Sequence, residues 1–180
     1  IKTIVLDPGH GGKDPGTVEG KKQEKLYPLQ LARELRELLT KAGFKVHLTR
    51  SSDALIDPEA RPGIARERAA ALCISLHFNS ADGPGGSAVK GSEVYCLTPA
   101  NAHSTNDRGE RGHASTLAGN RCDTRNVQLA YLVQKSLVDK AGAEDRGVKR
   151  ARFAVLKYAE MPAVLVEAAF MTNAGDAKKI

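Results

Sequence analysis

The chain has 180 residues, of which 41% are apolar, and a formal net charge of +6. This length suits a single domain with a sizeable core, and no apolar run approaches the about 18 residues of a membrane-spanning helix. The positive charge favours anionic partners or an ordinary basic surface, but aromatic residues make up only 4% and tryptophan is absent, so we expect no nucleic-acid partner that stacks its bases.

The chain opens on an apolar run over residues 2–6, which predicts a buried strand. No charged segment followed by an apolar one precedes it, so no signal peptide is visible, and we expect a mature domain or one trimmed from a longer protein. Pro8 and the glycines after it stop the strand. His10 therefore lies where a strand ends and a flexible backbone begins.

Helical and strand-like segments alternate along the rest of the chain. A leucine stripe predicts a helix over residues 24–41, which Gly43 ends. Two irregular stretches interrupt the alternation: 81–91 is a predicted surface loop, and 99–125 a long loop or insertion. The other predicted elements are strands over 44–49, 72–77, 92–97, 154–157 and 163–166, and helices over 59–71 and 126–141.

This alternation predicts an α/β fold. We expect one domain over residues 1–180, with a mostly parallel, twisted sheet of about six strands and helices on both faces.

The three cysteines, Cys73, Cys96 and Cys122, form no recognisable framework. Their odd number and the absence of a C-x-x-C motif argue against a zinc knuckle or a disulfide scaffold. Cys73 lies in an apolar run and is expected to be a buried thiol. A bridge between Cys96 and Cys122 is left open.

Four residues that can do chemistry fall at the ends of predicted elements. His10, His77 and Glu167 follow strands, and Glu24 begins a helix that follows the first strand. Because the carboxyl ends of parallel strands share one edge, these side chains can converge there. Two histidines and one glutamate, with one position open, match the ligands of a catalytic zinc ion, and a further carboxylate could handle the proton.

Each of these residues also has a plainer interpretation, and no short H-E-x-x-H motif supports the zinc site. His10 and His77 could each make ordinary hydrogen bonds in a turn or at a strand end. Glu24 lies among lysines and, taken alone, fits a solvated helix start better. Glu167 is harder to explain this way, because a carboxylate between apolar runs is expected to be partly buried and to need a partner.

Several segments, in the right order, resemble the catalytic domain of zinc-dependent N-acetylmuramoyl-L-alanine amidases, which are bacterial cell-wall hydrolases. The likeness covers almost the whole chain, and one departure is Ala168-Ala169, where the family commonly has Thr-Gly or Thr-Ala. The segments that carry it are residues 4–16 (IVLDPGHGGKDPG), 24–25, 46–50, 74–79 (ISLHFN), 146–149 (RGVK), 153–156 and 162–173.

The resemblance implies a role for each matching residue. It makes His10, Glu24 and His77 the ligands of one Zn²⁺ and Glu167 the catalytic glutamate, which takes a proton from water and passes it to the leaving amine. The bond cut would be the amide between N-acetylmuramic acid and L-alanine in peptidoglycan. Asn79 and Arg146 are implied to contact the substrate.

The resemblance also implies where and with what the protein works. It implies an exported protein that works in the periplasm or outside the cell at the cell wall. It also implies a monomer that acts on peptidoglycan, with separate wall-binding domains or an activator as further partners. Some relatives carry a helix that blocks the zinc site, but residues 99–125 lack an apolar helical stripe. We therefore expect no blocking helix and a groove that is open without an activator.

Three other functions are compatible with parts of this sequence. A zinc peptidase or deacetylase would use the same metal chemistry on another amide. A wall-binding module that has lost catalysis would not need all four functional residues, which are present. A phosphate-binding loop over residues 9–12 is disfavoured because neither G-x-x-x-x-G-K-[ST] nor G-x-G-x-x-G occurs there.

Overall fold

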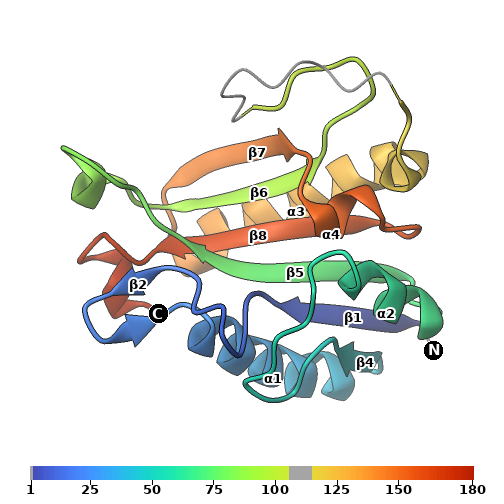
Figure 1. The fold of residues 1–180 in the computed structure, drawn as a ribbon, viewed down its shortest axis with the longest axis horizontal. Coiled ribbons are helices and arrows are strands. Elements are labelled where there is room, and N and C mark those ends of the chain that lie inside the picture. Colours follow the sequence, from blue (N-terminus) through green and yellow to red (C-terminus); the bar gives the residue numbers. More distant parts are fainter. Residues whose placement is uncertain (1, 106–114) are drawn as a thin grey trace.

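The computed structural model describes residues 2–105 and 115–180. Its centre is a six-stranded sheet with the strand order β4-β1-β5-β8-β6-β7 (Figure 1). The first four strands in this order, β4, β1, β5 and β8, are parallel to one another. Strand β6 pairs antiparallel with β8 and parallel with β7. The strands are β1 (Thr3–Pro8), β4 (Lys45–Leu48), β5 (Leu72–Asn79), β6 (Ser92–Leu97), β7 (Asp145–Ala151) and β8 (Ala163–Phe170).

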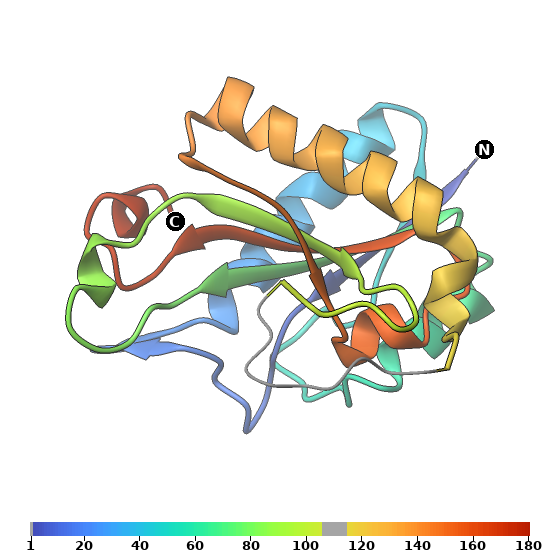
Figure 2. The same ribbon diagram turned by 90° about the horizontal axis from the view of Figure 1, so that it is seen from above.

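Helices cover both faces of this sheet. The long helices α1 (Leu26–Lys41) and α3 (Asp123–Ala141) lie on one face (Figure 2), and the short helices α2 (Arg61–Glu67) and α4 (Ala154–Lys157) pack on the other. Side chains alternate between the two faces along each strand. In β1, Ile4 and Leu6 join the core under α1 and α3, and Val5 joins the core under α2 and α4.

The predicted α/β class is confirmed, with the qualification that two of the six strands run against the other four. A small hairpin of β2 (Val18–Glu19) and β3 (Lys22–Gln23) precedes α1. Short 3₁₀ turns cover Gly86–Ala88, Ala118–Cys122 and Asp176–Lys178. No helix within residues 2–105 and 115–180 is long and apolar enough to cross a membrane.

The sequence prediction was wrong for one strand and, in the central sheet, missed another; it also did not include the short hairpin of β2 and β3. Residues 154–157, predicted as a strand, form the single turn of α4, because a four-residue apolar run has no periodicity that separates strand from helix. The missed strand is β7, whose sequence DRGVKRA is mostly polar. As an edge strand next to β6 it can carry polar side chains that an inner strand could not.

Several predicted boundaries also shift, and two of them bear on the site. Strands β5 and β8 continue to Asn79 and Phe170, so His77 and Glu167 lie within strands rather than at their ends. Helix α1 begins at Leu26, which leaves Glu24 in the segment before it. The expected loop over 99–125 ends early, because α3 starts at Asp123. The expected lack of a blocking helix there concerns in part residues 106–114, which lie outside the described residues.

The three cysteines are free thiols, so the bridge left open between Cys96 and Cys122 is not formed. Cys73 and Cys96 are buried, as expected for Cys73, and Cys122 is half-buried.

A buried polar network lies where β1 ends. Asp7, 1% exposed, accepts hydrogen bonds from Arg61 Nη1 at 2.9 Å and from Ser75 Oγ at 2.7 Å, and Thr49 Oγ1 also donates to it. The Arg61 side chain is only 4% exposed. A carboxylate and a guanidinium this deeply buried depend on each other, because neither has water to replace its partner.

We expect Asp7→Ala to lower the free energy of unfolding by about 3–5 kcal/mol, because Arg61 would be left buried and unpaired. The control is Asp139→Ala, which removes an exposed pair with Lys135 on α3 and should cost less than about 1 kcal/mol. Chemical denaturation of both variants measures the difference, and equal losses would contradict the importance of the buried pair.

Candidate metal centre and active site

His10 lies two residues beyond β1 in a turn that has an unusual backbone. His10, Gly11 and Gly12 all have positive φ angles, of 58°, 128° and 59°. Such a conformation is disfavoured for a residue with a Cβ, such as histidine, and persists only where the surroundings hold it. The surroundings here are the two arginines described next.

Two buried arginines hold this turn by its carbonyl oxygens. Arg50 donates to the carbonyls of Pro8 and Gly9, and Arg61 donates to those of Pro8 and His10. Because Arg61 is at the same time paired with Asp7, the position of the His10 backbone is tied to the end of β1.

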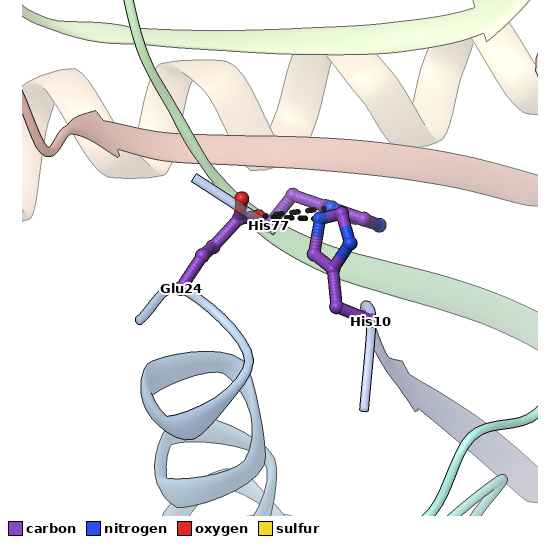
Figure 3. Close-up of side chains that lie close together, drawn as sticks. All are labelled: His10, Glu24 and His77. Atoms are coloured by element: carbon purple, nitrogen blue, oxygen red, sulfur yellow. Dashed lines mark hydrogen bonds and ion pairs between the residues drawn. The ribbon is translucent and has the colours of Figure 1, made fainter. Parts of the chain in front are cut away.

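The structure brings His10, Glu24 and His77 together (Figure 3), with one potential ligand atom of each within 4.8 Å of the others. Glu24 Oε1 lies 3.0 Å from His10 Nε2 and 3.1 Å from His77 Nδ1. Glu24 is buried, so the alternative of a solvated helix start is wrong. Two imidazole nitrogens and one carboxylate oxygen are a donor set that zinc accepts in catalytic sites, so this group could hold a metal ion.

Further hydrogen bonds orient these three side chains. Asp14 Oδ2 lies 2.8 Å from His10 Nδ1, on the far side of the ring from Glu24. The backbone amides of Thr17 and Phe78 donate to the two Glu24 oxygens, at 2.9 and 3.1 Å. Burial raises the pKa of Glu24, but its hydrogen bonds with both histidines lower it by more, so it stays ionised, as a metal ligand must.

The side chains of the ligand group pack directly against the backbone of two glycines, Gly9 and Gly16. A Cβ added to Gly9 would lie 2.2 Å from His77 Cε1, so the imidazole of His77 lies directly against the Gly9 backbone. A Cβ at Gly16 would lie 2.6 Å from both Glu24 Oε2 and His10 Cδ2. These two positions therefore need glycine because the side chains approach the backbone closely.

Glu167 lies beside the ligand group, where it is the register partner of His77 in the neighbouring strand. Its Oε2 atom is buried and has no hydrogen-bond partner among the described residues. Burial raises the pKa of Glu167 to about 7. A carboxyl group with such a pKa can both take up and release a proton near neutral pH.

One cavity of about 330 Å³ joins these residues. His10, Glu24, His77 and Glu167 all line it, as does Asn79, and apolar side chains line it as well. Arg146 does not line it and instead pairs with Glu93 on β6, with 3.0 Å between Nε and Oε2. The apolar lining includes Phe153, Ala154, Val155 and Leu165.

Asp14 and Glu93 were not among the predicted site residues. Asp14 follows His10 by four residues inside the glycine-rich turn, but nothing in the sequence shows that its side chain turns back to the ring. Glu93 did leave a signal: it is the only acidic residue in the run 92–97, and a carboxylate in a buried strand needs partners, as was argued for Glu167.

Comparison with known proteins gives a consistent result along the chain. A family model described as N-acetylmuramoyl-L-alanine amidase matches residues 4–180. N-acetylmuramoyl-L-alanine amidase LytC of Bacillus subtilis is 35% identical over 179 residues, which are 99% of this chain and 31% of LytC. The uncharacterized protein YqiI of the same organism is 32% identical over 179 residues, which are 99% of this chain and 75% of YqiI.

Solved structures agree. The crystal structure of an N-acetylmuramoyl-L-alanine amidase from Clostridium difficile 630 has a TM-score of 0.80 and 28% identity, and the match covers 99% of this chain and 84% of that one. AmiC2 of Nostoc punctiforme has a TM-score of 0.78 and 29% identity, with the same coverage. The chain spans 31% of LytC and 47% of AmiC of Neisseria meningitidis, less than half the length of these curated relatives.

We expect Gly9→Ala to weaken zinc binding by on the order of 10- to 100-fold, because the added methyl group displaces the His77 ring. Gly63→Ala is the matched control, since nothing lies within 4 Å of the Cβ it would add in α2. Competition with a zinc chelator measures both affinities. Unchanged affinity in Gly9→Ala would show that the ring position does not matter for metal binding.

Proposed function

Because the chain belongs to the N-acetylmuramoyl-L-alanine amidase family, we propose that it hydrolyses the amide bond between N-acetylmuramic acid and L-alanine in peptidoglycan, releasing stem peptides from glycan strands. The observation that carries this proposal is the cavity in which a His-Glu-His group adjoins Glu167, whose Oε2 atom is buried and has no hydrogen-bond partner within the described part of the chain.

The metal in this proposal is one Zn²⁺ held by His10 Nε2, Glu24 and His77 Nδ1. The nitrogens assigned are those that face Glu24 Oε1. Zinc bound there would lower the pKa of a water molecule and polarise the carbonyl of the amide. The carboxylate of Asp14 would fix the tautomer of His10 by accepting a hydrogen bond from its Nδ1–H group.

Glu167 is the proton carrier in this proposal. It takes a proton from the attacking water and returns it to the nitrogen of the leaving L-alanine, which makes the amine a better leaving group. Its surroundings suit this task, because burial has raised its pKa to about 7 and no described group forms a hydrogen bond with its Oε2 atom.

The remaining residues of the site bind the substrate. Asn79 lines the cavity next to Glu167, and Arg146 lies beyond it on β7. Peptidoglycan lies outside the cytoplasm, so the protein is exported and works in the periplasm or at the cell wall, as a monomer. Wall-binding domains or an activator are its candidate partners, as the curated relatives are longer than this chain.

A chelator should abolish hydrolysis of purified peptidoglycan, and added Zn²⁺ should restore it, because the proposed reaction needs a metal ion to activate water and polarise the amide carbonyl. The chain alone, without an activator, is expected to be active. Mass spectrometry should find peptides with a new L-alanine amino terminus. A different new terminus or a released acetate would instead indicate a peptidase or a deacetylase, and activity that survives chelation would exclude the metal mechanism.

Replacement of the proposed proton carrier separates catalysis from metal binding. Glu167→Gln should retain one zinc per chain and lose about 10²- to 10⁴-fold in turnover, because the amide cannot transfer the proton. Glu160→Gln, which alters an exposed pair with Arg66, is the control and should keep full activity. Metal analysis and rate measurements test both, and an active Glu167→Gln variant would remove Glu167 from the mechanism.

A further inference from the structure

A second polar cluster lies next to Glu167, on the side away from the metal ligands. Glu93 in β6 is directly opposite Glu167 in β8, so both side chains are on the same face of the sheet. Glu93, 3% exposed, accepts hydrogen bonds from Asn79 Nδ2 at 2.8 Å and Tyr95 Oη at 2.7 Å. Its other oxygen accepts from Arg146 Nε at 3.0 Å and from Lys149 Nζ.

The two cations are rigidly placed and still partly exposed. The Arg146 guanidinium lies 4.9 Å from the centre of the Phe170 ring, and Lys149 Nζ lies 5.9 Å from that of Tyr95. Their side chains are 30% and 20% exposed. Only Nε of Arg146 is hydrogen-bonded among the described residues, so its two terminal nitrogens can donate to a ligand.

The charges of this cluster do not cancel. Glu93 is ionised, because its hydrogen bonds with Lys149, Tyr95 and Arg146 outweigh the effect of burial and lower its pKa. One carboxylate faces two cations, and one positive charge remains. A guanidinium with free terminal nitrogens beside an ammonium group is suited to bind a carboxylate.

The distance to Glu167 fits a peptide substrate. The cluster lies one to two strands away from β8, which corresponds to about 5–10 Å across the sheet. An extended peptide covers about 3.3–3.6 Å per residue, so the cations would meet a group one to three residues beyond the amide that is cut. Asn79 connects the two places, because it lines the cavity and donates to Glu93.

We propose that Arg146 and Lys149, held in place by Glu93, bind a free carboxylate of the stem peptide and so select substrates that carry one. This inference rests on the proposed function, and it deepens that function by naming the part of the substrate recognised and the residues that recognise it.

The test compares two synthetic N-acetylmuramoyl peptides that differ only in whether the peptide carboxylates are free or converted to carboxamides. The zinc-loaded chain should prefer the free carboxylate on the order of 10- to 100-fold in kcat/KM. Arg146→Gln should lose most of this preference, because KM rises more for the carboxylate substrate than for the carboxamide substrate and the ratio of the two kcat/KM values falls toward one. Lys149→Gln should act in the same direction, and it serves if Arg146→Gln does not fold.

Arg36→Gln is the control, because it removes an exposed arginine from α1 on the opposite face of the sheet. It should keep the preference. If Arg146→Gln slows both substrates equally, the cluster supports Glu167 rather than the peptide, and the inference is overturned. If the unaltered chain hydrolyses neither substrate, the proposed function fails, and calorimetric binding of the two peptides to the unaltered chain and to Arg146→Gln still decides whether the carboxylate site exists.

Discussion

The buried pair of Asp7 and Arg61 is the interaction on which the site depends. Asp7 ends β1 on the same face of the sheet as His77 and Glu167, and Arg61 reaches it from α2. The same guanidinium binds the carbonyls of Pro8 and His10. The positive φ angle of His10 is disfavoured by itself and needs a restraint. Arg61 provides one, because it cannot move away from the turn without leaving the buried carboxylate of Asp7 unpaired.

The site also depends on an arrangement of like charges that separate elements compensate. Three glutamates lie in a row across the sheet. Glu24 lies beside β5, Glu167 belongs to β8, and Glu93 belongs to β6. Glu24 is compensated by the two histidines and backbone amides, and Glu93 by Arg146 and Lys149. Only Glu167 is left without such partners among the described residues. The middle carboxyl group thus differs from its neighbours in its surroundings, and this difference separates the proposed roles of ligand, proton carrier and anchor.

The sequence predicted most of the site because its residues follow strong strand signals. His10, His77 and Glu167 each come after or within a buried apolar run, and parallel pairing brings such positions to one edge. Glu24 was a candidate from its place at a predicted helix start, but its role as a ligand rested on the resemblance. Lysines surround it in sequence, and its burial comes from the β2–β3 hairpin and the turn around Gly16. Local patterns do not report contacts of that kind.

The errors have a related cause. Strand β7 is polar because it lies at the edge of the sheet, and α4 is too short to show a helical period. The cationic partners of Glu93 could not be predicted without β7, because Arg146 and Lys149 both belong to it. Missing one edge strand therefore hid the whole second cluster, although Glu93 itself was visible as an acidic residue in an apolar run.

The reversed direction of β6 and β7 has a consequence for how such a domain can diversify. Strands β5 and β8 bring their carboxyl ends to the site, whereas β6 and β7 bring their amino ends, with Glu93 and Arg146 near their starts. The loops entering β6 and β7 are separate from those that carry His10 and Glu24. Insertions or substitutions there can therefore alter the half of the edge around Glu93 and Arg146 without changing the chain segments that carry His10 and Glu24.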